Sequence, residues 1–153
     1  MRSLLLGAVL GLAVFAGGAA RAATLEVKDA WIRSTTPGMP TAVGYATIIN
    51  HGFTSDRLTG ARTGAAASAG LHEMTTAGGV MKMRPIPGGI AIGGSATLKL
   101  SPGARHLMLV GLKRPMKAGA HVKVTLEFQR AGAVVADFVV RDSAPAGTAG
   151  MHM

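Results

Sequence analysis

The sequence predicts an all-β protein, a Greek-key β-sandwich of about eight or nine short strands. Runs of β-type residues alternate with turn signals of Gly, Pro, Asn and Asp along the chain from residue 24 onward. No window of helical length shows a sustained apolar period of about 3.6 residues. Hydrophobic residues make up 48% of the 153 residues, which is enough for the core of one domain, although aromatic residues contribute only 4%.

The first half of the predicted domain begins with an alternating segment that carries the single tryptophan, Trp31. A β-rich segment follows the loop over residues 34–40, and a modest strand comes next. Gly78 and Gly79 then separate two short apolar runs, as expected for a hairpin turn. The predicted strands of this half are residues 25–33, 42–50, 57–63, 71–74 and 80–84.

The second half continues the same pattern of short runs and turn signals. Ser101, Pro102 and Gly103 separate two of its strands, and the Ala131-Gly132 step forms the turn of a final hairpin. The predicted strands of this half are residues 90–92, 96–100, 105–112, 121–129 and 134–141.

The N-terminal segment has the pattern of a secretory signal peptide. Arg2 provides the positively charged N-terminal region of such a peptide. Residues 4–15 form an apolar stretch that is too short to span a bilayer comfortably. Ala20-Arg21-Ala22 is a typical cleavage site, and an uncleaved anchor is the alternative. We therefore expect a signal peptide at 1–22, a β-sandwich domain at 23–142, a flexible tail at 143–153, a periplasmic location and no membrane span in the mature chain.

The charge balance is strongly basic, with a formal net charge of +9 at pH 7. A basic surface favours acidic partners in general, including nucleic acid, anionic membranes and acidic proteins. Here the Lys and Arg residues are scattered singly, without the aromatic interleaving of single-strand binders. We therefore expect no nucleic-acid partner, and a solvated basic surface or an acidic protein partner instead.

The chain contains no cysteine. A secreted protein without cysteine has no disulfides, so its stability must come from the sheet core. The absence also excludes metal sites built from thiolates, including blue-copper electron-transfer sites.

Histidine and methionine gather in three short clusters, LHEM at 71–74, VMKM at 80–83 and HLM at 106–108. Residues two apart in a strand share a face, so His106 and Met108 should project side by side. The glycine turn lets LHEM and VMKM pair, which brings His72 and Met83 near each other. A metal site of His72, Met83, His106 and Met108 then requires only that the two sheet regions be adjacent.

This donor set favours Cu(I). Imidazole nitrogen and thioether sulfur are neutral ligands, and thioether is soft, as Cu(I) is. Methionine forms no disulfides, so it suits an oxidising compartment better than cysteine. Histidine alone would suit zinc or Cu(II), and strand alternation should turn Glu73 away from His72.

Each of these residue types also has an ordinary structural role. A methionine in a β-domain usually fills the core, and this interpretation suits Met74, Met81 and Met116, with Met39 open to either role. A histidine usually lies on the surface or makes a hydrogen bond. We expect that structural role for His51 and His121.

The same stretch resembles the periplasmic copper chaperones of the PCuAC family. Their motif is a His, ten residues, a Met, about twenty-one residues and then His-x-Met. Here ten residues separate His72 from Met83, and 22 separate Met83 from His106, with the extra residue in the Gly-rich loops between Pro85 and Gly103. The segments DAWIRSTTPG and GYATIIN also resemble the family, so the similarity covers nearly the whole mature chain.

The resemblance implies a cupredoxin-like β-sandwich with a surface-exposed Cu(I) site. By position, its ligands are His72, Met83, His106 and Met108. It also implies delivery of copper to the copper-bearing subunit of cytochrome c oxidase, often alongside another copper assembly protein. Some relatives carry a C-terminal extension that binds a second copper, and only Met151-His152-Met153 hints at one here.

The expected function is therefore a Cu(I) metallochaperone and not an enzyme. No Ser/His/Asp arrangement, paired carboxylates or phosphate-binding glycine loop is apparent in the sequence. Copper sequestration for tolerance, without a dedicated acceptor, needs the same site and remains open. A third hypothesis is an adhesion or ligand-binding module whose methionines are core, and it predicts that the four ligand side chains do not converge.

Overall fold

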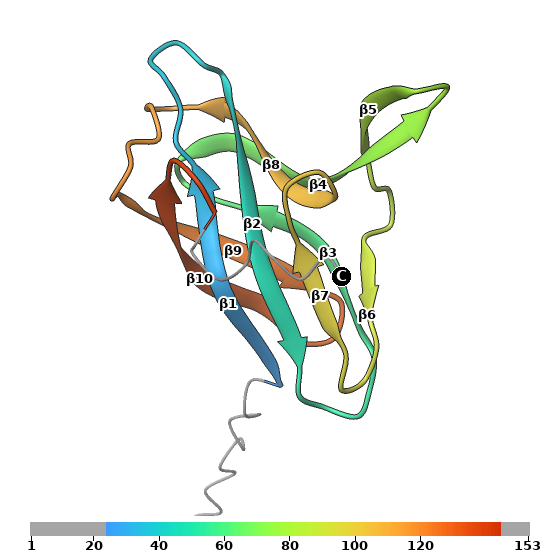
Figure 1. Ribbon diagram of the computed structural model, residues 1–153. Coiled ribbons are helices and arrows are strands. Elements are labelled where there is room, and N and C mark those ends of the chain that lie inside the picture. Colours follow the sequence, from blue (N-terminus) through green and yellow to red (C-terminus); the bar gives the residue numbers. More distant parts are fainter. Residues whose placement is uncertain (1–23, 145–153) are drawn as a thin grey trace, which may run out of the picture.

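The computed structural model describes residues 24–144, and Figure 1 shows this part of the chain as β-strands joined by loops. The all-β prediction is confirmed, and the described range contains ten strands, one at each of the ten predicted strand segments. The Greek-key sandwich arrangement stays a prediction. The strands are β1 (Leu25–Arg33), β2 (Thr41–Asn50), β3 (Asp56–Arg62), β4 (Ala66–Ala77), β5 (Val80–Pro85), β6 (Ile90–Ile92), β7 (Thr97–Leu100), β8 (Arg105–Leu112), β9 (His121–Phe128) and β10 (Gly132–Arg141).

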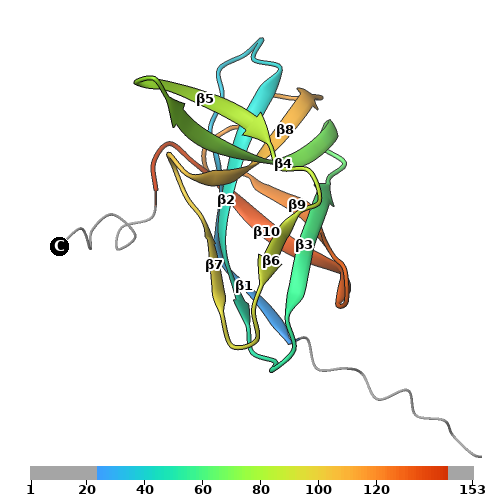
Figure 2. The same cartoon turned by 90° about the vertical axis from the view of Figure 1, so that its right-hand side faces the viewer.

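Seven of these strands close into a ring. The pairing runs from β4 through β8, β2, β1, β10 and β9 to β3, and a single bridge between Ala61 and Ala69 returns from β3 to β4. β1 and β10 pair in parallel, whereas the other pairs in the ring are antiparallel. β5, β6 and β7 attach to β4, β3 and β2. Figures 1 and 2 show an elongated, barrel-like body.

The core lies inside the ring and is built mainly from aliphatic side chains at alternate strand positions. Leu107 and Leu109 of β8 are each 1% exposed, and Ile48 of β2 and Phe138 of β10 are fully buried. Each such side chain contributes about 2 kcal/mol relative to an exposed position. Since Leu107 and Leu109 face the core, their neighbours on β8 lie on the outer face of the sheet.

β4 is longer than the sequence indicated. Only residues 71–74 were predicted as strand, because residues 64–70 are rich in Ala and Gly, which have low β-propensity. The structure extends the strand over Ala66–Ala77, since pairing with β3 and β8 on either side holds this segment extended. Tertiary pairing thus overrides local propensity.

The second half of β4 leaves the body and pairs with β5 to form an arm. Figures 1 and 2 show this hairpin projecting from the barrel, and every residue of β5 is exposed. Gly78 and Gly79 have φ of +60° and +79°, the backbone that a two-residue type I′ turn requires. The predicted hairpin between residues 71–74 and 80–84 is therefore present.

The base of the arm is held by hydrogen bonds to backbone carbonyls. The N–H of Ile86 donates to the carbonyl of Leu71 at 2.9 Å. The Arg57 guanidinium donates to the carbonyls of Gly88 and Gly89, at 3.0 and 3.4 Å. These bonds anchor the segment that follows β5.

Within residues 24–144 there is no helix with the length and apolarity that a membrane crossing needs. The predicted signal peptide at 1–22 and the Met151-His152-Met153 tail lie outside the described residues. The division into signal peptide, domain and tail therefore stays a prediction.

Candidate metal centre

Two predicted ligands, His72 and His106, face each other directly across adjacent strands. The β4–β8 register pairs His72 with His106, and their ring centroids lie 6.1 Å apart with planes inclined by 18°. The core neighbours Leu71 and Leu107 also pair, so the two imidazoles share the outer face of the sheet. The requirement that the two sheet regions be adjacent is met.

The orientation of the His106 ring leaves one nitrogen free to bind. Its Nδ1 lies 3.2 Å from the carbonyl oxygen of Ala104, which only accepts, so Nδ1 carries the proton and donates. The other nitrogen, Nε2, then holds a lone pair. A carbonyl that fixes the imidazole tautomer in this way is a common partner of metal-binding histidines.

Burial favours the neutral form of His106. The side chain is 3% exposed, and this desolvation is the main cause that lowers the pKa of His106 below its ordinary value of 6.5. The hydrogen bond to Ala104 raises the pKa and the neighbouring His72 lowers it, and the net direction is downward. A neutral imidazole is the form that binds metal.

Each of the two histidines also has a buried ring nitrogen in an energetically unfavourable environment. Nδ1 of His72 and Nε2 of His106 are buried and have no hydrogen-bond partner among residues 24–144. A buried unpaired polar atom costs about 1–3 kcal/mol, so such atoms call for an explanation. A shared metal ion between the rings would satisfy both lone pairs.

Met108 lies next to this histidine pair. It is two residues from His106 on β8, and its partner across the β4–β8 ladder is Gly70. Because glycine has no side chain, the surface opposite Met108 is left open. A Cβ at Gly70 would lie 3.7 Å from Cε1 of His72, which shows how close this opening is to the imidazole.

Met83 lies on the arm, two residues further from the body than the sequence suggested. The β4–β5 register pairs Met83 with Met74, whereas His72 pairs with Pro85. Met83 is therefore a diagonal neighbour of His72 on the same face, at a typical separation of about 7–8 Å, which a long side chain spans. The direct partner of Met83 is Met74, a residue that the sequence assigned to the core.

An aromatic pair borders His106 on the side of β2. The Tyr45 ring lies edge-on to His106 at 6.4 Å between centroids and packs against Trp31 at 4.8 Å. Both aromatic side chains are buried, and burial raises the pKa of Tyr45 above its ordinary value of 10.0. The contact of Tyr45 with the histidine has no signature in the sequence.

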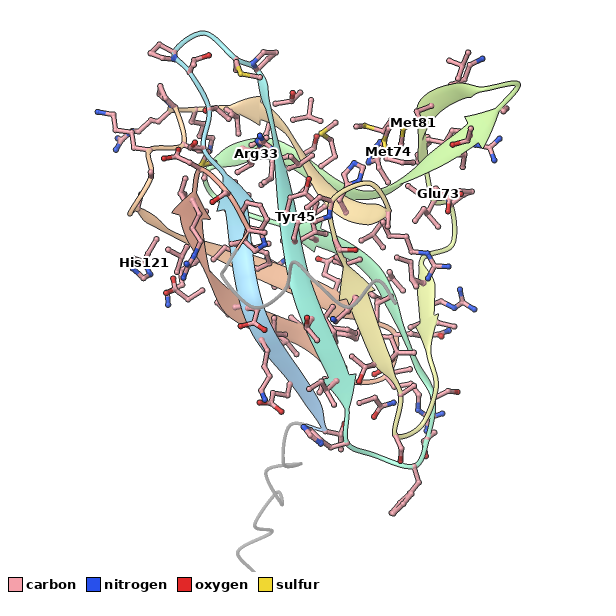
Figure 3. The ribbon with its side chains drawn as sticks, viewed as in Figure 1. Arg33, Tyr45, Glu73, Met74, Met81 and His121 are labelled. Atoms are coloured by element: carbon pink, nitrogen blue, oxygen red, sulfur yellow. The ribbon has the colours of Figure 1, made fainter. Side chains whose placement is uncertain are left out.

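The other histidines and methionines of residues 24–144 have varied surroundings. His51 lies 2.6 Å from a Glu26 oxygen and His121 lies 2.6 Å from an Asp137 oxygen, both at exposed positions. Met116 is core, at 4% exposed, and Met39 is exposed in a loop. Figure 3 shows Glu73 on the opposite side of the arm from Met74 and Met81.

Carboxylates contribute little near the histidine pair. Within the described range no group of three or more His, Asp or Glu side chains could hold a metal ion. The donors that surround His72 and His106 on the outer face are instead the thioethers of Met108, Met83 and Met74. A mixed nitrogen and sulfur environment of this kind suits a soft ion.

The chain has relatives among known sequences. Residues 25–140 match the family described as "Putative lipoprotein LpqE-like". A putative lipoprotein of Leifsonia xyli subsp. xyli is 38% identical over 104 residues, which are 68% of this chain and 61% of the relative. The chain therefore spans about three fifths of the length of this curated relative.

Solved structures with similar folds include PCuAC domains. The apo PCuAC domain from PmoF1 is 27% identical, with 80% of this chain and 95% of that chain covered and a TM-score of 0.64. Apo-DR1885 from Deinococcus radiodurans is 29% identical, with 94% and 95% covered and a TM-score of 0.62. The Cu(I) form of DR1885 is 29% identical, with 84% of each chain covered and a TM-score of 0.61. Since the family match spans most of its length, this chain belongs to the LpqE-like family of putative lipoproteins.

Proposed function

We propose that this protein is a Cu(I) metallochaperone of the PCuAC type that binds one ion through His72, Met83, His106 and Met108. The observation that carries the proposal is the pair of buried, unpartnered nitrogens on facing histidines, with thioethers on the same face. The fold similarity to the Cu(I) form of DR1885 supports the choice of metal.

The chemistry of the ligands suits storage of the +1 ion and its transfer. All four donors are neutral, so they stabilise Cu(I) relative to a harder, more highly charged ion. The histidines hold the ion on rigid paired strands, whereas Met83, 42% exposed, opens the site to an acceptor. An acceptor's ligand can therefore replace a thioether without unfolding of the domain, and no catalytic step is involved.

The location and acceptor belong to the same proposal. A signal peptide would place the domain in the periplasm, where the copper-bearing subunit of cytochrome c oxidase, or another copper assembly protein, would receive the ion. In bacterial lipoproteins the lipid is attached to a cysteine, and the 153 residues contain none.

The test is an anaerobic Cu(I) titration against a competing chelator, on wild type and Met108→Ala. We expect one tight site in wild type and an affinity lower by at least about tenfold in the variant, since even indirect ligand partners contribute this much. Met39→Ala, an exposed methionine in the β1–β2 loop, is the matched control and should bind as wild type does. Equal affinity in Met108→Ala and wild type would refute the ligand assignment.

Sequestration without an acceptor requires the same site, so binding data do not separate it from delivery. A deletion strain separates the two functions. Loss of oxidase activity at low copper, with normal copper tolerance, supports delivery. Copper sensitivity with normal oxidase activity supports sequestration.

A further inference from the structure

The arm carries three methionines on one face. The β4–β5 register pairs Met74 directly with Met83, and Met81 lies two residues further out on β5, opposite Thr76. Residues two apart on a strand and residues directly opposite each other share a face, so all three thioethers lie on the face that carries His72. Figure 3 shows the Met74 and Met81 side chains on one side of the arm.

These methionines do not serve the usual purpose of the residue, which is to fill the core. None of the three belongs to the buried core of residues 24–144 or to the apolar side chains packed against it, whereas Met116 does. Exposure increases outward from the half-buried Met74 to Met83, at 42%, and Met81, at 57%. Two long apolar side chains therefore remain in solvent, where they contribute little hydrophobic stabilisation.

We propose that Met74, Met81 and Met83 form a second, outer copper position made only of thioethers, through which Cu(I) reaches and leaves the histidine pair. The inference rests on the proposed function of the inner site and extends it. Met83 belongs to both positions, so it links them. Three thioethers form a neutral soft donor set, which Cu(I) accepts and which hard divalent ions do not.

The exchange between the two positions is a simple ligand substitution. As the ion moves outward, a bond from copper to the sulfur of Met74 or Met81 forms while a bond to an imidazole nitrogen or to the Met108 sulfur breaks. The ion stays in the +1 state and no proton moves, because thioethers carry no proton and the released imidazole is neutral. No oxidant, reductant or further reactant is required.

The outer position is tested in a protein that lacks the histidine pair. In the full-length variant His72→Ala/His106→Ala, with 13C-labelled methionine methyl groups, Ag(I) serves as a redox-inert stand-in for Cu(I). We expect weak binding that shifts the methyl signals of Met74, Met81 and Met83 and leaves Met116 unchanged. If the methyl signals of Met74 and Met81 do not shift at saturating Ag(I), the proposal is overturned.

The transfer role is tested separately, with the histidines intact. Met74→Leu/Met81→Leu keeps apolar side chains of similar size and removes only the sulfurs, so it also preserves any apolar docking surface. We expect the equilibrium affinity for one Cu(I) to stay within about threefold of wild type, because all four inner ligands remain. Release to a chelator should slow by about tenfold, which corresponds to a barrier higher by about 1.4 kcal/mol. Met39→Leu is the control for an exposed methionine elsewhere.

The outcomes distinguish the outer position from the inner site. Tight Cu(I) binding by wild type, together with an unchanged release rate in Met74→Leu/Met81→Leu, would overturn the outer position and leave the inner site intact. Absence of tight binding in wild type would overturn the inner site, and the methyl signals of the histidine-free variant would still decide the outer one.

Discussion

Replacing His106 by leucine should abolish tight Cu(I) binding and leave the metal-free protein at least as stable as wild type. Cu(I) affinity should fall by at least about a hundredfold, because a direct donor contributes more than its supporting partners. Stability should not fall, because Nε2 of His106 is buried without a partner among residues 24–144. Removing an orphaned polar atom relieves about 1–3 kcal/mol.

The hydrogen bond that is lost in His106→Leu offsets only part of that gain. The Ala104 carbonyl, which accepts from His106, also accepts from the N–H of Met74 at 3.2 Å, so it stays paired. We therefore expect the free energy of unfolding, measured with urea on the apoprotein, to change by between zero and about +2 kcal/mol. A loss of more than about 1 kcal/mol would show that His106 is an ordinary structural residue.

The core residue next to His106, Leu107, serves as the control, because its replacement should lower stability and leave Cu(I) affinity unchanged. Leu107 is 1% exposed and faces the core from the adjacent position of β8. Leu107→Ala should lower the free energy of unfolding by about 2–5 kcal/mol. Its Cu(I) affinity should stay close to that of wild type, measured at a temperature where the variant is folded, because all four ligands remain.

Gly89→Ala should be among the most destabilising single substitutions in the protein. Gly89 has φ of +79°, and a Cβ there would lie 2.2 Å from the carbonyl oxygen of Leu58. A backbone atom at that distance cannot turn aside as a side chain can, so the loop must shift. We expect a loss of about 3 kcal/mol or more in the free energy of unfolding, from clash and backbone strain together.

A substitution at Gly88 distinguishes the effect of the steric clash from that of the backbone strain. It has a nearly equal φ of +81°, and a Cβ there would have nothing within 4 Å. Gly88→Ala therefore incurs only the left-handed strain, about 1–2 kcal/mol. Urea denaturation of the two variants should show Gly89→Ala as clearly the less stable, and equal losses would contradict the close approach of Gly89 to the Leu58 backbone.

Alternation along one strand made part of the site predictable from sequence. His106 and Met108 are two residues apart on a segment with strong β-propensity, so their shared face follows from strand geometry alone. The Gly78-Gly79 step likewise identified the hairpin, because both residues need positive φ in a tight turn.

Only part of the register between strands follows from the sequence. The prediction that Met83 lies beside His72 was wrong by two residues, because the two-residue turn sets Ala77 opposite Val80 and therefore pairs Met83 with Met74. The direct pairing of His72 with His106 joins strands that are distant in sequence. Such pairing depends on the whole sheet and not on any local pattern.

The orphaned nitrogens were also beyond sequence reasoning. Whether a histidine nitrogen is buried and unpaired depends on the Ala104 carbonyl and on the cover that Tyr45 supplies. Neither contact has a sequence signature. The sequence identified the donor types, and the structure supplied the physical reason why two of them would gain from binding an ion.

The central claim is that Cu(I) binds between paired imidazoles and thioethers, and X-ray absorption at the copper edge tests it most directly. The protein loaded anaerobically with one equivalent of Cu(I) should show an edge typical of the +1 ion and a first shell that contains both sulfur and imidazole nitrogen. The sulfur contribution should fall in Met108→Ala. A shell of nitrogen and oxygen alone, unchanged in that variant, would contradict the account.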